Sequence, residues 1–147
     1  MLSTLPESIT QQAASGLMTT ETVCIQTSDT VVETLKRFNR ERHSFYPLID
    51  SESQKLLGVI ARDQFYDYVQ LNGLKESACL DSVEYTHLPT ERPEALVEQC
   101  LETMIRGGSN KLLITDENGQ LHGILSIRDV LAQAVQDKVP EAEVEAE

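Results

Sequence analysis

The chain contains one sequence unit twice, about 65 residues apart. Residues 44–58 align with residues 109–123 without a gap, and six of these fifteen positions are identical. The identical pairs are Ser44/Ser109, Leu48/Leu113, Ile49/Ile114, Glu52/Glu117, Leu56/Leu121 and Gly58/Gly123. Self-similarity at a fixed period marks a repeated supersecondary unit. The chain therefore has to fold as two copies of one unit, and we expect binding clefts between the copies.

Each copy reads as strand, helix, strand, strand and helix, from its apolar periodicity and its turn residues. In the first copy this pattern predicts strands at 22–25, 47–49 and 56–61, and helices at 31–38 and 62–69. The second copy predicts strands at 85–88, 111–114 and 121–126, and helices at 94–105 and 127–136. One such unit is too small to cover its own apolar strands. Two units packed sheet to sheet are therefore expected to share one core.

Turn and cap signals punctuate these elements. Ser28 and Asp29 are N-cap candidates for the first helix, and Gly107-Gly108 is typical of a helix C-cap. Asn118-Gly119 predicts a hairpin turn because both residues tolerate positive φ. Asn72-Gly73 indicates a turn in the connection between the copies, and residues 5–15 are expected to form a short helix that packs on the pair.

The net charge excludes several classes of function. The 24 acidic and 12 basic residues give a formal charge of −12, which would repel a nucleic-acid backbone or an anionic membrane surface. No apolar run approaches the roughly 20 residues of a membrane span, and residues 1–20 lack a signal-peptide pattern. We expect a soluble, cytoplasmic protein that binds neither nucleic acid nor membrane.

Signals for metal binding and catalysis are weak. Cys24, Cys79 and Cys100 have no CxxC spacing and read as reduced thiols, and together with the three histidines they lack the spacing of zinc ligands. The chain has no glycine-rich phosphate loop, and no histidine is spaced beside a nucleophile. We therefore expect no metal, no required cofactor and no enzymatic activity.

Several motifs, in order and at constant spacing, resemble the cystathionine-β-synthase (CBS) domain. They are Gly16-Leu17-Met18, Asp29-Thr30-Val31, Ser44-x-x-Pro47-Leu48-Ile49-Asp50 and Gly123-Ile124-Leu125-Ser126-Ile127-Arg128-Asp129. Over residues 12–136 the chain is similar to a stand-alone tandem CBS pair, a Bateman module. The resemblance implies an α/β fold of two β-α-β-β-α repeats packed as a pseudo-twofold pair. We expect a helical segment at 1–15, repeats at 16–70 and 81–137, a linker at 71–80 and an acidic tail at 138–147.

The resemblance also implies a function. CBS pairs commonly bind AMP, ADP, ATP or S-adenosylmethionine between their repeats, as regulatory ligands rather than cofactors, and bias a partner protein. They usually pair exposed helices into a homodimer. Here the apolar candidates for that surface are Phe65, Val69, Val130 and Leu131, weighed evenly against packing within the chain. The expected partners are a second copy, an adenosine ligand and an unidentified regulated protein. The alternative is a ligand-free scaffold for dimerisation or partner binding.

The exit motif of the second copy has a chemistry that can be read from the residues. Ser126 precedes a helix whose first N–H groups face outward, and Asp129 can accept two hydrogen bonds from vicinal ribose hydroxyls. Ser-x-x-Asp is also close to a capping box, in which the same groups only satisfy the helix end. The family resemblance favours ribose contact.

By the same resemblance, further residues would surround the nucleotide. The base would contact Met18, Thr22, Val23, Phe45, Tyr46 and Ile124, and the phosphates would face Ser109, Asn110 and Lys111, with help from Arg128 or Arg106. Phe45 and Tyr46 could instead pack in the core and make no contact with the base. Because so few basic residues lie near the expected phosphates, a monophosphate or a neutral adenosine moiety should bind more easily than ATP. In the first copy Ala61 and Gln64 replace Ser126 and Asp129, so we expect that cleft to be empty or specific for another ligand.

Overall fold

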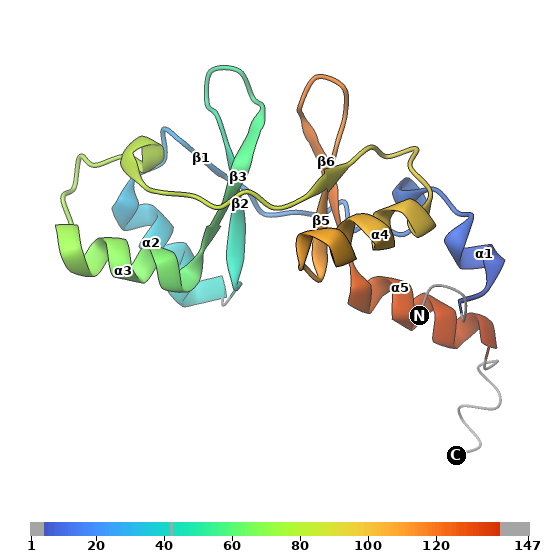
Figure 1. Ribbon diagram of the computed structural model, residues 1–147. Helices are drawn as coiled ribbons and strands as arrows, with labels where there is room; N and C mark the ends of the chain where they lie inside the picture. Colours follow the sequence, from blue (N-terminus) through green and yellow to red (C-terminus); the bar gives the residue numbers. More distant parts are fainter. Residues whose placement is uncertain (1–4, 42, 139–147) are drawn as a thin grey trace, which may run out of the picture. The chain divides into compact units, whose positions relative to one another are not determined.

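The computed structural model describes residues 5–41 and 43–138, which form two three-stranded sheets with helices (Figure 1). The helices are α1 (Glu7–Thr10), α2 (Val31–Glu41), α3 (Arg62–Asn72), α4 (Val97–Gly107) and α5 (Ile127–Lys138). The strands are β1 (Ile25–Gln26), β2 (Phe45–Ile49), β3 (Leu56–Ala61), β4 (Thr90–Glu91), β5 (Lys111–Thr115) and β6 (Leu121–Ser126). Two 3-10 turns, Ala14–Gly16 and Leu80–Ser82, complete the described elements. The repeated α/β unit predicted from the sequence is confirmed.

The two sheets have the same topology. In each, a two-residue strand pairs in parallel with the next strand, which pairs antiparallel with the third. The central strands β2 and β5 are almost wholly buried. Their continuous apolar runs therefore fit strands that are covered on both faces. The exit helix α3 or α5 follows directly on the third strand.

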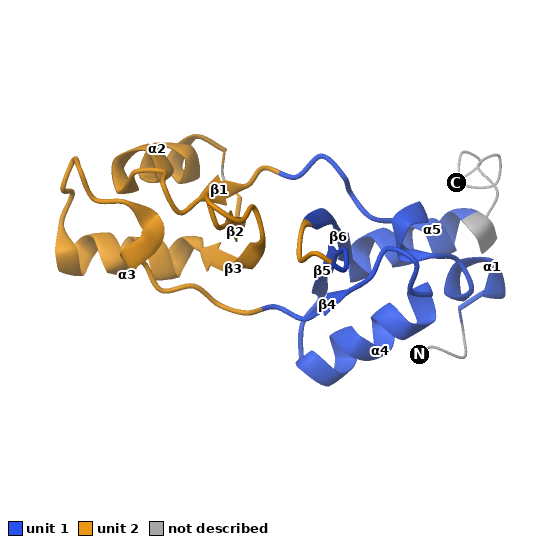
Figure 2. Ribbon diagram, turned by 90° about the horizontal axis from the view of Figure 1, so that it is seen from above, with its two compact units in different colours: residues 1–22, 88–117, 121–147 blue, residues 23–87, 118–120 orange. Residues whose placement is uncertain are grey.

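The chain divides into two compact units that do not coincide with the two sequence repeats (Figure 2). Unit 1 comprises residues 1–22, 88–117 and 121–147, whereas unit 2 comprises residues 23–87 and 118–120. The N-terminal segment of each repeat therefore belongs to the unit of the other repeat. We call residues 12–22 and 78–87 the first and second lead segments.

Equivalent hydrogen bonds hold each lead segment in place. In unit 1, the N–H of Ala14 donates to the carbonyl of Ala95 at 2.8 Å, and the N–H of Val97 donates to the carbonyl of Gln12 at 2.8 Å. In unit 2, Leu80 bonds to Asp29 and Val31 bonds to Ala78 in the same way, at 3.0 and 2.9 Å. Each lead segment is thus fixed to the start of the first helix of the other repeat.

Each unit has an apolar core of its own, where the sequence predicted one shared core. The core of unit 1 is aliphatic and includes Leu101, Leu112 and Leu125, whereas the core of unit 2 is built around Phe38 and Phe65. The ring centroids of these two phenylalanines lie 5.3 Å apart, a favourable distance for an aromatic pair. The lead segments explain the difference, because each one helps to cover the unit that it joins.

Several element boundaries differ from the sequence prediction. The predicted strand at 85–88 is wrong: Thr86 instead forms an isolated bridge with Val59, and the strand of the second repeat is β4. The parallel ladder begins only at Pro89, whose carbonyl accepts from the N–H of Leu113 at 3.1 Å. Residues 85–87 pack on β3 of unit 2, so they cannot pair within the sheet of their own repeat.

The glycine turn and C-cap predictions are confirmed, whereas the N-cap predicted for the first helix is wrong. Gly119, Gly108 and Gly73 have φ of 80°, 64° and 76°, in the hairpin turn and at two helix ends. For α2 the cap is Thr30, whose hydroxyl accepts from the N–H of Glu33 at 3.1 Å, and not Ser28 or Asp29. The predicted N-terminal helix is the short α1, and the acidic tail at 139–147 lies outside the described residues. None of the described helices combines the length and apolar character needed to cross a bilayer.

Candidate functional site

The exit motif of the second repeat lies in unit 1, at the junction of β6 and α5. The first lead segment runs beside this junction: Thr19 and Ile124 exchange two backbone hydrogen bonds of 2.8 and 3.0 Å. Gly123 allows this close approach, because a Cβ at that position would lie 2.7 Å from the carbonyl oxygen of Thr19 and 2.9 Å from Sδ of Met18. The structure thus places Met18 beside the exit motif, and its contact with a base stays a prediction.

Ser126 and Asp129 play different parts at the start of α5. The hydroxyl of Ser126 accepts the N–H of Asp129 at 3.1 Å, so Ser126 caps the helix. A complete capping box would also have the Asp129 carboxylate accept a backbone N–H in return. In residues 5–41 and 43–138 this half-buried carboxylate has neither a hydrogen bond nor an ion pair. The capping interpretation therefore accounts for Ser126 and leaves the carboxylate of Asp129 available to a ligand.

The residues expected near phosphates lie at the start of β5. Lys111 is paired with Ser126 in the β5–β6 register, and the N–H of Ile127 donates to the carbonyl of Asn110 at 2.9 Å. Ser109 uses its hydroxyl within its own turn, accepting from the N–H of Lys111 at 3.1 Å and donating to its carbonyl at 2.8 Å. Arg128 is exposed in the first turn of α5. This group therefore adjoins the exit motif within unit 1.

The other predicted base contacts are divided between the units. Thr22 belongs to unit 1, but Val23, Phe45 and Tyr46 belong to unit 2. Tyr46 is only 1% exposed, and its ring centroid lies 4.6 Å from that of Phe38. The hydroxyl of Tyr46 donates to the carbonyl of Arg37 at 3.2 Å, and burial beside Glu41 raises the pKa of the phenol. This arrangement favours the core-packing alternative for Tyr46. The contact of Val23 and Phe45 with a base stays a prediction.

The exit motif of the first repeat lies in unit 2 and is built differently. Ala61 occupies the N-cap of α3 and provides no side-chain cap. Thr86, in the second lead segment, bridges Val59 as Thr19 bridges Ile124, with two backbone hydrogen bonds of 2.8 Å. The hydroxyl of Thr86 lies 3.4 Å from Oε1 of Gln64. The side chain of Gln64 therefore already accepts a hydrogen bond from Thr86, whereas the carboxylate at the equivalent position, Asp129, bonds to no described residue.

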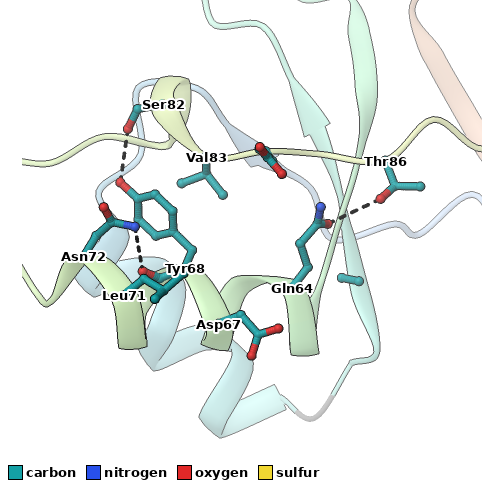
Figure 3. Close-up of a pocket in the computed structure, with 10 residues that line it drawn as sticks. Gln64, Asp67, Tyr68, Leu71, Asn72, Ser82, Val83 and Thr86 are labelled. Atoms are coloured by element: carbon teal, nitrogen blue, oxygen red, sulfur yellow. Dashed lines mark hydrogen bonds between the residues drawn. The ribbon is translucent and has the colours of Figure 1, made fainter.

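This second junction opens into a hollow of about 700 Å³ (Figure 3). Its lining residues come from the end of β3, from α3 and from the second lead segment, and they are Ala61, Gln64, Asp67, Tyr68, Leu71, Asn72, Ser82, Val83, Glu84 and Thr86. The sequence pointed to Ala61 and Gln64 alone. The helical spacing of Gln64, Asp67, Tyr68 and Leu71 was a signal for the wall on α3. The second wall could not be found in this way, because it depends on where the lead segment packs.

For two of the four dimer-surface candidates the structure supports the alternative, packing within the chain. Phe65 and Val130 are 0% exposed and belong to the cores of unit 2 and unit 1, because each points from its exit helix toward its own sheet. Leu131 is 41% exposed, whereas Val69 is partly buried against the core of unit 2. Among the described residues no cluster of His, Cys, Asp and Glu could hold a metal ion, and the three cysteines are free thiols.

Comparison with known proteins accounts for the duplicated architecture. The CBS domain matches twice, at residues 14–70 and 82–135. The chain belongs to the CBS domain family. Both matches begin in or next to a lead segment and end in an exit helix, so the chain is a tandem CBS pair whose repeats exchange their lead segments. The family and the fold class inferred from the sequence are confirmed.

Individual relatives of this CBS pair are distant. An uncharacterised protein of Methanocaldococcus jannaschii, MJ0188, is 26% identical over 128 residues, which are 86% of this chain and 45% of that protein. The chain thus spans less than half the length of this relative. A CBS domain structure of a bacterial CNNM/CorC family Mg²⁺ transporter in complex with ATP has a TM-score of 0.72 and 20% identity, covering 87% of this chain and 90% of that one. A structure of CBSX2 in complex with AMP has a TM-score of 0.67 and 20% identity, covering 86% and 98%.

Proposed function

We propose that this CBS pair is a regulatory module that binds an adenosine-containing ligand at the exit motif of the second repeat. The carboxylate of Asp129 carries the proposal. It lies half-buried in the first turn of α5, beside the first lead segment, and no described residue bonds to it. A carboxylate without another partner can accept hydrogen bonds from both vicinal hydroxyls of a ribose. CBS proteins of the same fold that were solved with AMP and with ATP support this ligand class.

The charges around the site favour a ligand with few phosphates. Lys111, Arg128 and Arg106 are the basic residues at the start of β5, the start of α5 and the end of α4. They act within a chain of net charge −12, whose long-range potential opposes a triphosphate. AMP, ADP or the adenosine moiety of S-adenosylmethionine therefore fits this site better than ATP does. Of these, AMP combines the ribose contact with the least anionic charge among the nucleotides.

The signal would be a shift between two arrangements of the pair. A ligand shifts such an equilibrium only by the difference between its affinities for the two states. Because the first lead segment joins the exit motif directly, a ligand that contacts Ile124 and Met18 also contacts the chain leading into the other unit. The module would in this way act on a partner protein without catalysing a reaction itself.

A thermal-shift titration with AMP, ADP, ATP and S-adenosylmethionine tests the proposal. A ligand present at 100 times its Kd stabilises the folded state by about 2.7 kcal/mol, which raises Tm by roughly 5–10 °C for a chain of this size. Asp129→Asn should remove most of that rise. Asp63→Asn is the matched control, because Asp63 is an exposed acid in the first turn of the other exit helix. An equal ligand response in both variants would exclude Asp129 as the clamp.

A ligand-free scaffold is the second candidate, and one observation favours it. Leu131 and Val135 are 41% and 57% exposed, and they are four residues apart on one face of α5. An apolar pair on one helix face suits contact with another protein surface. The absence of any thermal response to adenine compounds, with a dimer that Leu131→Glu dissociates, would establish the scaffold in place of the sensor.

A further inference from the structure

The hollow at the exit motif of the first repeat has a chemistry of its own. Its volume of about 700 Å³ lies within the usual range for small-molecule sites, roughly 300–1,000 Å³. The polar groups in its lining are the carboxylates of Asp67 and Glu84, the amides of Gln64 and Asn72, and the hydroxyls of Tyr68, Ser82 and Thr86. The lining contains no lysine, arginine or histidine. The hollow is therefore rich in hydrogen-bond acceptors and carries two formal negative charges.

The two carboxylates come from different elements and lack partners. Asp67 is on α3 and Glu84 is in the second lead segment, and both are exposed. In the part of the chain that the structure describes, neither makes an ion pair with a basic residue. A phosphate placed between them would be repelled. The hollow thus disfavours the nucleotides proposed for unit 1.

The two exit helices carry a carboxylate on the corresponding face at different positions, Asp129 in α5 and Asp67 in α3. At the first-turn position α5 has Asp129 where α3 has Gln64, whereas three residues later α5 has Ala132 and α3 has Asp67. Both charged positions lie on the same helix face, one turn apart. Asp67 therefore lies one turn further from the helix end, where the N–H groups and the helix dipole would offset its charge, whereas the exposed Asp63 stays in the first turn of α3.

Polar contacts within the hollow fix parts of its wall (Figure 3). The hydroxyl of Tyr68 lies 3.2 Å from that of Ser82, which joins α3 to the second lead segment. The side-chain N–H of Asn72 donates to the carbonyl of Tyr68 at 3.0 Å. Val83 is 4% exposed and Leu71 is 85% exposed, so apolar surface also borders the hollow. A ligand that fits this lining combines a short alkyl chain with positively charged ends.

We propose that this hollow binds a small organic cation, a linear di- or polyamine whose ammonium groups contact Asp67 and Glu84. The alkyl chain would lie against Val83, Leu71 and the ring of Tyr68, and the amide and hydroxyl oxygens would accept the remaining ammonium hydrogens. The proposal concerns unit 2 alone and does not rest on the nucleotide site of unit 1. The pair would then have two sites for ligands of opposite charge.

Titration of the ¹⁵N-labelled full chain with spermidine, and separately with putrescine, tests this inference by NMR. The expected result is saturable shifts of the backbone amides of Gln64, Tyr68, Val83 and Thr86. Asp67→Asn and Glu84→Gln should each weaken binding about fivefold or more, since each removes one nearby charge in a solvent-exposed setting. Asp63→Asn is the control, because it removes an exposed acid from the same helix without touching the lining, and it should change Kd less than twofold.

The controls separate the proposal from general attraction to an acidic protein. Equal weakening by Asp63→Asn and Asp67→Asn would overturn it, as would shifts spread over the whole surface or an absence of shifts at 10 mM amine. Asp129→Asn should leave amine binding unchanged, so loss of the nucleotide response and loss of the amine response are distinguishable.

Discussion

Replacement of Gly58 by alanine should separate the second lead segment from β3. Gly58 precedes Val59, which exchanges two backbone hydrogen bonds of 2.8 Å with Thr86. A Cβ on residue 58 would lie 2.5 Å from the carbonyl oxygen of Thr86 and 2.7 Å from Cδ2 of Tyr85. The Tyr85 ring can rotate away, but the Thr86 carbonyl belongs to the backbone and can move only with the segment. Either the bridge opens or β3 shifts.

The cost follows from these contacts. Overpacking of a buried position costs about 1–3 kcal/mol, and each bridge hydrogen bond contributes about 0.5–1.5 kcal/mol. If the segment moves enough to weaken both bonds, the free energy of unfolding should fall by about 2–4 kcal/mol. With a urea m-value of about 2 kcal/mol/M, the unfolding midpoint should fall by about 1–2 M.

Urea unfolding followed by circular dichroism measures this change, and hydrogen exchange at Val59 and Thr86 locates it. Gly107→Ala is the matched control, because a Cβ there would meet only the ring of Pro89, at 3.3 Å, while the helix gains propensity. We expect that variant to stay within about 0.5 kcal/mol of the wild type. A loss below 1 kcal/mol in Gly58→Ala, with unchanged protection of both amides, would refute the close approach on which the argument depends.

Further predictions concern the helix cap, the buried thiol and the aromatic core. Ser126→Ala should lower the free energy of unfolding by about 1 kcal/mol, and Ala61→Ser, where φ and ψ already suit an N-cap, should raise it by a similar amount in urea titrations. Burial raises the pKa of Cys100 from 9.0 to about 11, so the unfolded chain loses this proton first as pH rises. Between pH 9 and 11 stability should fall by roughly 2–3 kcal/mol from this thiol alone, and Cys100→Ala should show a correspondingly flatter pH profile. Phe38→Ala should cost about 3–5 kcal/mol and broaden the NMR signals of Tyr46 in unit 2.

The sequence predicted the parts of the fold that depend on local pattern. The strands β2, β3, β5 and β6, the exit helices and the turns at Gly108 and Gly119 follow from periodicity and from glycine conformations, and all are present. The role of residues 85–88 could not be predicted in the same way. Their β-prone composition suits pairing with either sheet, and only the packing of the second lead segment assigns them to β3.

For the candidate site too, the residues of a local motif could be predicted from the sequence, whereas those placed by tertiary packing could not. Asp129 and Ser126 were recognisable because the motif is contiguous, and the structure then distinguished the capping serine from the carboxylate of Asp129, which bonds to no residue among 5–41 and 43–138. The sequence left Tyr46 open between base contact and core packing. Its burial against Phe38 depends on contacts between α2 and β2, which no local sequence pattern indicates. Glu84 was not identified as a lining residue, since it reaches the hollow from a segment distant in sequence from α3.

The exchanged lead segments bear on how such a chain could have arisen by duplication. A lone copy of the repeat would keep its own sheet and helices but would lack the segment that covers them, because its own lead segment belongs to the other unit. Two separate copies could satisfy one another only by trading these segments, as in a domain-swapped dimer. Fusion of the two genes would turn that trade into an intramolecular one. Cutting this chain between the repeats should therefore yield halves that recover their fold only when mixed.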